Sequence, residues 1–369
     1  MHLKHGGMVL LGLSTLSAPL VAHSAVTDKA DSTLQKQLAS PKSKGWTSVI
    51  VKTDSAPTAA QEAALTALGG DVYRHLSLIN SVALRVPNKN LAKLAALPFV
   101  TRISWDGTVK KNDEFIVEHS GADVAWSNPG VQGTGVGVAV LDSGIRPHQD
   151  LKNPVTGANR LLTSVSFVPP PPGGTIVAND MNGHGTHIAG IIAGAGQAST
   201  GGNYFRTFKG VAPDANLVNV RVLDENGQGT VSQVISGLQW VSQNAPKYKI
   251  KVVNLSLGHP VGESFTTDPL CQAVEKLWRG GIVVVCAAGN DGRLNATQTA
   301  GMDNEGWSTA YGSIQSPAND PYVITVGATK NMDGNRANDR IATYSGRGPS
   351  RLDLILKPTV ITYGSLAGD

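Results

Sequence analysis

Two short runs of small and β-branched residues constrain the fold of this chain most. Residues 135–141 (GVGVAVL) and residues 281–288 (GIVVVCAA) each have about the length of one strand and carry no charge. Such runs are typical of strands that are buried on both faces of a parallel sheet. Asp142 follows the first run and Asn290 comes shortly after the second. Polar residues at the carboxyl ends of such strands gather at the edge where open α/β sheets bind ligands.

The region around these runs alternates between strand and helix patterns. We expect helices at 231–243, where apolar residues recur at helical spacing, and at 271–279. We expect strands at 217–223, 252–257, 282–287 and 323–326. This order predicts an α/β fold, in which a parallel sheet has helices on both faces.

A histidine between two glycines lies in a third run, residues 182–190 (NGHGTHIAG). Small apolar residues follow, so the pattern predicts a buried helix with His184 at its N-terminal end. The glycines allow another backbone to approach the imidazole closely, and imidazole transfers protons near neutral pH. A lone histidine of this kind is more often structural. Together with Asp142 and Asn290, however, His184 predicts a catalytic group of orienting acid, base and amide donor.

Two other side-chain sets leave alternatives open. His184 and His187 are three residues apart, but nothing completes a zinc motif such as His-Glu-x-x-His, so we predict no metal ligand here. Cys271 and Cys286 are the only cysteines. They could form one disulfide or remain two buried thiols.

Three blocks of the chain resemble the signature blocks of the subtilisin-like serine peptidases. They are residues 140–145 (VLDSGI), 183–190 (GHGTHIAG) and 287–290 (AAGN), and they follow one another in the family's order. Three blocks in order are far more specific than a single motif. The resemblance implies that Asp142 orients the imidazole, that His184 is the general base, and that the Asn290 amide donates to the oxyanion.

The resemblance also implies a cleft that binds a protein or peptide substrate. Segments of the family that bracket the substrate backbone correspond here to Gly227, Gly229, Ser256, Leu257, Gly258, Ala287, Ala288 and Gly289. An extended peptide can pair with bare backbone of this kind as an added strand, although ordinary turns would also explain the two glycines at 227 and 229. The small residues at 287–289 imply a roomy pocket and broad specificity.

The family's fourth block, a Gly-Thr-Ser-Met-Ala run with the nucleophilic serine, has no counterpart in the sequence. Ser365 is a poor substitute because Gly364 falls where the glycine of the family's Ala-Pro-Gly run belongs, so Ser365 comes too early. Thr359 and Tyr363 replace the Asp and Pro that are usual before this point. We therefore expect a chain cut short before its nucleophile, by an early stop, a frameshift or fragmentation, and nearly inactive on its own.

The first 25 residues predict a signal peptide. Lys4 provides a positive start, residues 8–21 are apolar, and small residues at 22–25 suit cleavage. The apolar stretch is too short to span a membrane comfortably, and we predict no stable span elsewhere. We expect an exported protein, secreted or periplasmic. The net charge of +4 and the lack of a basic run give no indication of nucleic-acid binding.

A separate unit is expected between the signal peptide and the catalytic blocks. Residues 26–45 are interpreted as a loosely ordered polar lead-in, and residues 46–110 as a small ferredoxin-like α+β domain. Its expected strands are 49–51, 72–78, 81–86 and 100–103, and its helices are 58–68 and 88–97. The domain resembles inhibitor-like propeptides of subtilisins, which implies an intramolecular inhibitor that is cut off between 109 and 114. A generic α+β domain is the alternative. The catalytic domain would then be residues 111–369.

Two functions follow from these observations. The first is an exported zymogen of a serine endopeptidase that hydrolyses peptide bonds in proteins. The second is a non-catalytic homologue that inhibits a protease or binds peptides through its propeptide-like domain. Asp142, His184 and Asn290 favour the first, because binding alone requires none of them. The resemblance leaves structural calcium possible, but we assign no acidic loop to it and predict no other cofactor.

Overall fold

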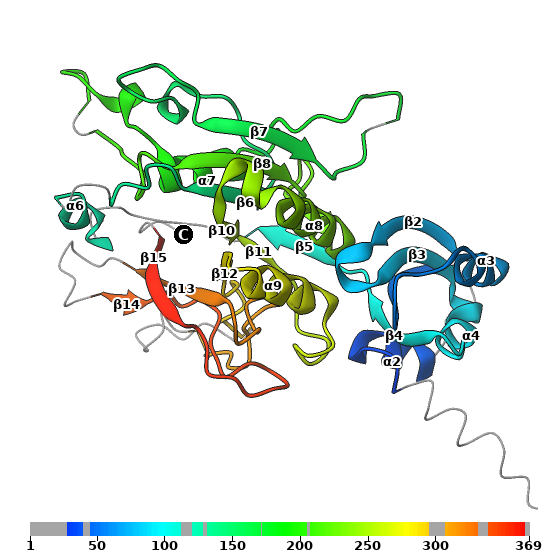
Figure 1. The fold of residues 1–369 in the computed structure, drawn as a ribbon. Coiled ribbons are helices and arrows are strands. Elements are labelled where there is room, and N and C mark those ends of the chain that lie inside the picture. Colours follow the sequence, from blue (N-terminus) through cyan, green and yellow to red (C-terminus); the bar gives the residue numbers. More distant parts are fainter. Residues whose placement is uncertain are drawn as a thin grey trace, which may run out of the picture.

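The computed structural model describes residues 28–39, 45–111, 120–127, 131–170, 172–204, 207–294, 307–330 and 339–365 of the 369-residue chain. The predicted signal peptide lies outside this set. Within the set, no helix is both long enough and apolar enough to cross a membrane. The described residues form a larger α/β unit and a smaller N-terminal α+β unit beside it (Figure 1).

A mostly parallel sheet organises the larger unit. Its strand order is β14-β13-β12-β10-β6-β8-β7, and β15 also pairs with β13. The strands are β6 (Gly137–Asp142), β7 (Leu161–Ser166), β8 (Asn216–Arg221), β10 (Ile250–Leu255), β12 (Val283–Ala287), β13 (Ile324–Lys330), β14 (Arg340–Ile341) and β15 (Val360–Ser365). All neighbouring pairs are parallel except β13 with β14. The predicted α/β fold is therefore confirmed.

Helices pack on both faces of the central strand β6. They are α7 (His184–Ala193) on one face and α8 (Val231–Tyr248) and α9 (Pro269–Arg279) on the other. One face of β12 and β13 is partly exposed, since Val283 and Ile324 are 42% and 37% exposed. The remaining short elements are α6 (Ala122–Ala125), η3 (Gln149–Leu151) and η4 (Gln197–Ser199). Side chains of β6 alternate between two hydrophobic clusters, since Val138 and Val140 pack with α7 while Ala139 and Leu141 pack with α8 and α9. Burial on both faces explains why this strand contains no polar residue before its end.

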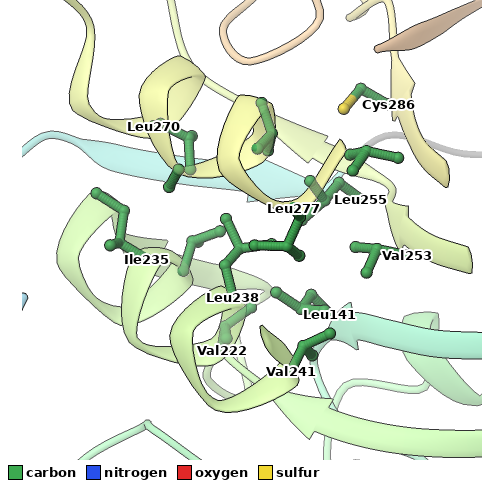
Figure 2. Packing of buried hydrophobic residues seen from close by; sticks show 14 of the residues in the cluster. Leu141, Val222, Ile235, Leu238, Val241, Val253, Leu255, Leu270, Leu277 and Cys286 are labelled. Atoms are coloured by element: carbon green, nitrogen blue, oxygen red, sulfur yellow. The ribbon is translucent and has the colours of Figure 1, made fainter. Parts of the chain in front are cut away.

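The cluster under α8 and α9 is the larger of the two. Its labelled side chains in Figure 2 are Leu141, Val222, Ile235, Leu238, Val241, Val253, Leu255, Leu270, Leu277 and Cys286. The helical residues point from α8 and α9 toward the strands, as expected for apolar positions at helical spacing (Figure 2). Cys271 and Cys286 are both buried free thiols, so the disulfide alternative is not realised in this structure.

The N-terminal unit has the predicted βαββαβ order. Its antiparallel sheet has the order β2-β3-β1-β4. The elements are β1 (Trp46–Thr53), α3 (Ala59–Ala67), β2 (Asp71–Leu76), η1 (Ser77–Ile79), β3 (Ser81–Pro87), η2 (Asn88–Asn90), α4 (Leu91–Ala95) and β4 (Val100–Trp105). The strand predicted at 72–78 ends earlier, at Leu76, because the chain turns through η1 and Asn80 has a φ of 51°. The helix predicted at 88–97 is also shorter, because residues 88–90 form the 3-10 turn η2 and only Leu91–Ala95 are α-helical.

The prediction of a loosely ordered lead-in at 26–45 is wrong for residues 28–39. They contain the helix α2 (Ser32–Ala39), which packs on the N-terminal sheet. Ala30, Leu34 and Leu38 are buried in the same cluster as Val49. Leu34 and Leu38 lie four residues apart on one face of α2, and the polar composition around them concealed this spacing.

We expect Leu34→Ala to lower the free energy of unfolding by about 2 kcal/mol, because the fully buried Leu34 side chain leaves a cavity. The loss should lie at the low end for such a substitution because a terminal helix can detach locally. Urea unfolding measures it, with the exposed Lys36→Ala as a matched control on the same helix. Equal stability of the two variants would mean that α2 contributes nothing to this core.

Candidate active site

Asp142 and His184 form a buried pair at the carboxyl edge of the sheet. Asp142 is the last residue of β6, and His184 is the first residue of α7. Asp142 Oδ1 lies 2.7 Å from His184 Nδ1, and each side chain is 1% exposed. Asp142 Oδ1 also accepts from the backbone N–H of Ser143 at 2.7 Å, which fixes the orientation of the carboxylate. The arrangement can hold Nδ1–H and leave Nε2 for proton transfer.

Glycine at position 185 makes this approach possible. A Cβ atom on Gly185 would lie 2.1 Å from the carbonyl oxygen of Gly144 and 3.1 Å from Asp142 Cβ. The first turn of α7 therefore packs directly on the backbone that follows β6. This contact accounts for the second glycine beside His184 in the sequence.

We expect Gly185→Ala to destabilise the protein by about 2 kcal/mol and to separate His184 from Asp142, because the new methyl group meets backbone atoms that cannot move away. Gly190→Ala on the same helix is the control, since nothing lies within 4 Å of its added Cβ. That control should gain up to about 1 kcal/mol from helix propensity. Thermal unfolding of the two variants compares them, and stabilisation by both would show that α7 does not pack as described.

Asn290 lies at the same edge of the sheet. It follows β12, which β10 alone separates from β6, and its side chain is exposed. The preceding Gly289 has a φ of 99°, and a Cβ there would lie 2.6 Å from Gln315 Cγ. A glycine is thus needed to turn the chain toward Asn290.

A strand of the chain itself lies between two of the segments that the sequence predicts to bind substrate. β5 (Thr108–Lys111) follows the N-terminal unit and pairs antiparallel with β9 (Gln228–Thr230) on one side and with β11 (Leu257–Gly258) on the other. Gly229 lies opposite Val109, and Leu257 lies opposite Lys111. The segments expected to bracket a substrate therefore hold the chain's own residues in an extended conformation.

The remaining predicted groove residues have different positions. Gly227 lies in the turn before β9 with a φ of 70°, and Ser256 lies just before β11. Ala287 is the last residue of β12. The N–H of Ala288 donates to Val326 O of β13 and so continues the pairing of β12 with β13. None of these three segments pairs with β5 among the described residues. The interval predicted for cleavage, 109–114, is described only as far as Lys111.

Further contacts, which the sequence did not indicate, hold β5 in place. The carboxylate of Asp106 accepts from the backbone N–H and the hydroxyl of Ser232, at 2.9 and 2.7 Å, in the first turn of α8. Burial raises the pKa of Asp106. Apolar side chains of the N-terminal unit (Ile50, Leu76, Ile79 and Ala83) belong to the same cluster as α8 and α9. The sequence around Asp106 gives no indication of this contact, because an aspartate after a strand can cap any helix that packs near it in the fold.

Two other predictions can be placed. Ser365 ends β15, and its backbone pairs with Lys330 of β13. Among the described residues, no group of three or more His, Cys, Asp or Glu side chains could hold a metal ion.

Comparisons with known proteins agree with this architecture. A model of the subtilase family matches residues 133–368, and a model of a peptidase inhibitor domain matches residues 21–106. The chain is 35% identical over 237 residues to serine protease AprX of Bacillus subtilis strain 168, covering 62% of this chain and 46% of AprX. It is 37% identical over 201 residues to subtilisin DY of Bacillus licheniformis, covering 54% and 64%. It is 33% identical over 304 residues to subtilisin E of Bacillus subtilis strain 168, covering 81% and 67%. The chain thus spans between about half and two thirds of these relatives.

Proposed function

Because the chain belongs to the subtilase family, we propose that it is a serine endopeptidase made as an exported zymogen. The buried Asp142–His184 pair is the observation that carries this proposal. A protein that only bound peptides would gain nothing from desolvating a carboxylate against an imidazole. Export rests on the apolar residues 8–21 and the small residues that follow them.

The proposed chemistry is hydrolysis of a peptide bond through an acyl-enzyme. His184 Nε2 takes the proton of the attacking serine hydroxyl and later gives it to the leaving amine. Asp142 accepts Nδ1–H of His184, with 2.7 Å between Oδ1 and Nδ1, and stabilises the imidazolium. Asn290 donates its amide to the oxyanion, a contribution of about 10²- to 10³-fold in such sites.

The N-terminal unit is proposed to be the inhibitor of this site. Its β5 tail fills the groove between β9 and β11, and no substrate strand can pair there at the same time. Cleavage after β5, within the predicted interval 109–114, would release the unit from the rest of the chain. We propose that the inhibitory domain includes α2 and so begins before residue 46.

The serine nucleophile decides between the two functions. The 369 residues contain no Gly-Thr-Ser-Met-Ala run, and we propose that hydrolysis requires a serine in such a run. The test begins by reading the coding sequence past codon 369 in all three frames. A product containing the run is then treated with a serine-directed covalent probe and a peptide substrate.

We expect labelling that is lost in His184→Ala and retained in the remote Asp214→Asn. Labelling of the 369-residue chain itself, lost in His184→Ala, would make Ser365 the first candidate nucleophile. The proposal would be overturned if no frame encoded the run and the 369-residue chain neither labelled nor cleaved. The non-catalytic, peptide-binding function would then stand.

A further inference from the structure

We propose that Asp180 is a positioning residue, which sets the distance between Asp142 and His184 by joining the turn after β6 to the first turn of α7. Asp180 lies in the loop before α7 and is 1% exposed. The inference rests on the proposed role of His184 as base.

The carboxylate of Asp180 is saturated with hydrogen bonds. It accepts from Ser143 Oγ (2.9 Å), Asn182 N (3.0 Å), Gly183 N (2.8 Å), Thr186 N (2.9 Å) and Thr186 Oγ1 (2.6 Å). Burial acts to raise the pKa of Asp180, but the bonds from Thr186, Gly183 and Ser143 outweigh it and lower the pKa. The group is therefore a fixed anion with no spare acceptor site.

On the α7 side, Asp180 supplies a cap that the helix itself lacks. The N-cap residue is Gly183, which has no side chain and makes no cap hydrogen bond. The first N–H groups of a helix need acceptors, and a carboxylate is favoured there by the helix dipole. By accepting from Gly183 N and Thr186 N, Asp180 holds the turn that begins with His184.

On the β6 side, Asp180 orients the residue next to Asp142. Ser143 is fully buried, and its hydroxyl donates to Asp180 Oδ1 while accepting from Gly185 N at 3.0 Å. Because the Ser143 O–H donates a hydrogen bond to Asp180, a lone pair of the Ser143 hydroxyl is directed to the N–H of Gly185. A short path of one hydroxyl and one amide therefore links the neighbour of Asp142 to the neighbour of His184.

The backbones of the two loops also meet closely at this point. A Cβ on Gly144, which has a φ of 121°, would lie 2.8 Å from Asp180 N. Arg146 Nε donates to Asp180 O at 3.0 Å, and Arg146 N donates to Thr186 Oγ1 at 2.9 Å. Both the side chain and the main chain of Asp180 thus contact the β6 turn, which an ordinary helix cap would not require.

Two single substitutions separate positioning from simple capping. Ser143→Ala removes the link to Gly185 and leaves every bond from α7 to Asp180 intact. Thr186→Val removes a hydroxyl donor to Asp180 and also the acceptor of Arg146 N, but it leaves the link from Ser143 to Gly185 intact. Asp224→Asn is the matched control, since Asp224 accepts loop N–H groups from Asn226 and Gln228 without contacting α7.

The experiment is NMR of the full chain labelled with ¹⁵N-histidine, with the His184 signals assigned by their loss in His184→Gln. We expect Asp180→Asn and Ser143→Ala to lower the pKa of His184 by about one pH unit and to weaken the downfield Nδ1–H signal. Thr186→Val should lower only the melting temperature, and Asp224→Asn should change neither signal.

An unchanged His184 titration and Nδ1–H signal in Ser143→Ala would overturn the inference and leave Asp180 as a helix cap. This outcome remains readable if Asp180→Asn fails to fold. The readout needs no serine nucleophile, so it is independent of the probe labelling that tests the proposed function. Failed labelling with a shifted His184 pKa would reject the protease and keep the positioning role.

Discussion

Asp142→Asn is expected to lower kcat about 10⁴-fold in a form of the enzyme that carries its serine nucleophile. The buried Asp142 carboxylate accepts Nδ1–H of His184 at 2.7 Å and balances the charge of the imidazolium. An asparagine amide is neutral and can present N–H to Nδ1, which favours the wrong tautomer of the base. Hydrolysis of a peptide substrate at saturating concentration measures the loss.

The same assay separates catalysis from folding. KM should change little in Asp142→Asn, because Asp142 contacts the base and not the peptide groove. Asp214→Asn is the control. Asp214 lies in the loop before β8, and its carboxylate accepts a hydrogen bond from Thr134. If Asp142→Asn lost less than about tenfold in kcat with a normal melting temperature, Asp142 would not act in the proposed triad.

The sequence predicted the parts of the fold that depend on local pattern. β6 was recognised because burial on both faces leaves only small and β-branched residues in a strand. The expectation of burial on both faces is wrong for β12, in which Val284 and Cys286 are buried but Val283 is 42% exposed. α8 and α9 were recognised from apolar residues at helical spacing. Their bounds moved where local chemistry intervened, as in α9, which begins at Pro269 because Asp268 caps it.

The missed features depend on contacts between distant segments. α2 was hidden because only Leu34 and Leu38 mark its buried face among polar residues. β5 has no pattern of its own and exists as a strand because β9 and β11 provide hydrogen-bond partners on both sides. Tertiary pairing of this kind overrides local preference, so no window of the sequence could have indicated it.

The candidate site shows the same division. Motif order identified Asp142 and His184 as candidates, and the structure brings them within hydrogen-bond distance. Asp180 was overlooked because its contacts arise only when the loop before α7 returns to the turn after β6. A loop aspartate four residues before a histidine is a common pattern with no meaning by itself.

The interface between the two units contains a carboxylate that should make stability depend on pH. Glu263, in the loop after β11, accepts from Arg102 Nε of β4 at 2.6 Å, and its side chain is 6% exposed. Burial, with a further contribution from Asp268, raises the pKa of Glu263 from 4.5 to about 7, against the opposing effect of Arg102. Asp31 lies near enough to add to the rise, and Ser104 donates a hydrogen bond that opposes it.

The direction of the effect follows from proton binding. Between pH 4.5 and 7 the folded protein keeps a proton on Glu263 that the unfolded chain has lost. Stability from this group is therefore complete below pH 4.5 and is lost as the pH rises to about 7. A shift of this size corresponds to roughly 3 kcal/mol in the free energy of unfolding.

Glu263→Gln should therefore stabilise the protein by roughly 3 kcal/mol at pH 8 and by little near pH 4.5, because glutamine cannot ionise and still accepts from Arg102. Urea unfolding at a series of pH values measures the difference from the wild type, in which all other titrating groups cancel. Exposed Glu225→Gln is the control for replacing a carboxylate at the surface. Arg102→Met should extend the loss to pH values above 7, because Arg102 lowers the pKa of Glu263 and its removal lets that pKa rise further. A pH-independent difference for Glu263→Gln would show that this carboxylate does not couple the inhibitor-like unit to pH.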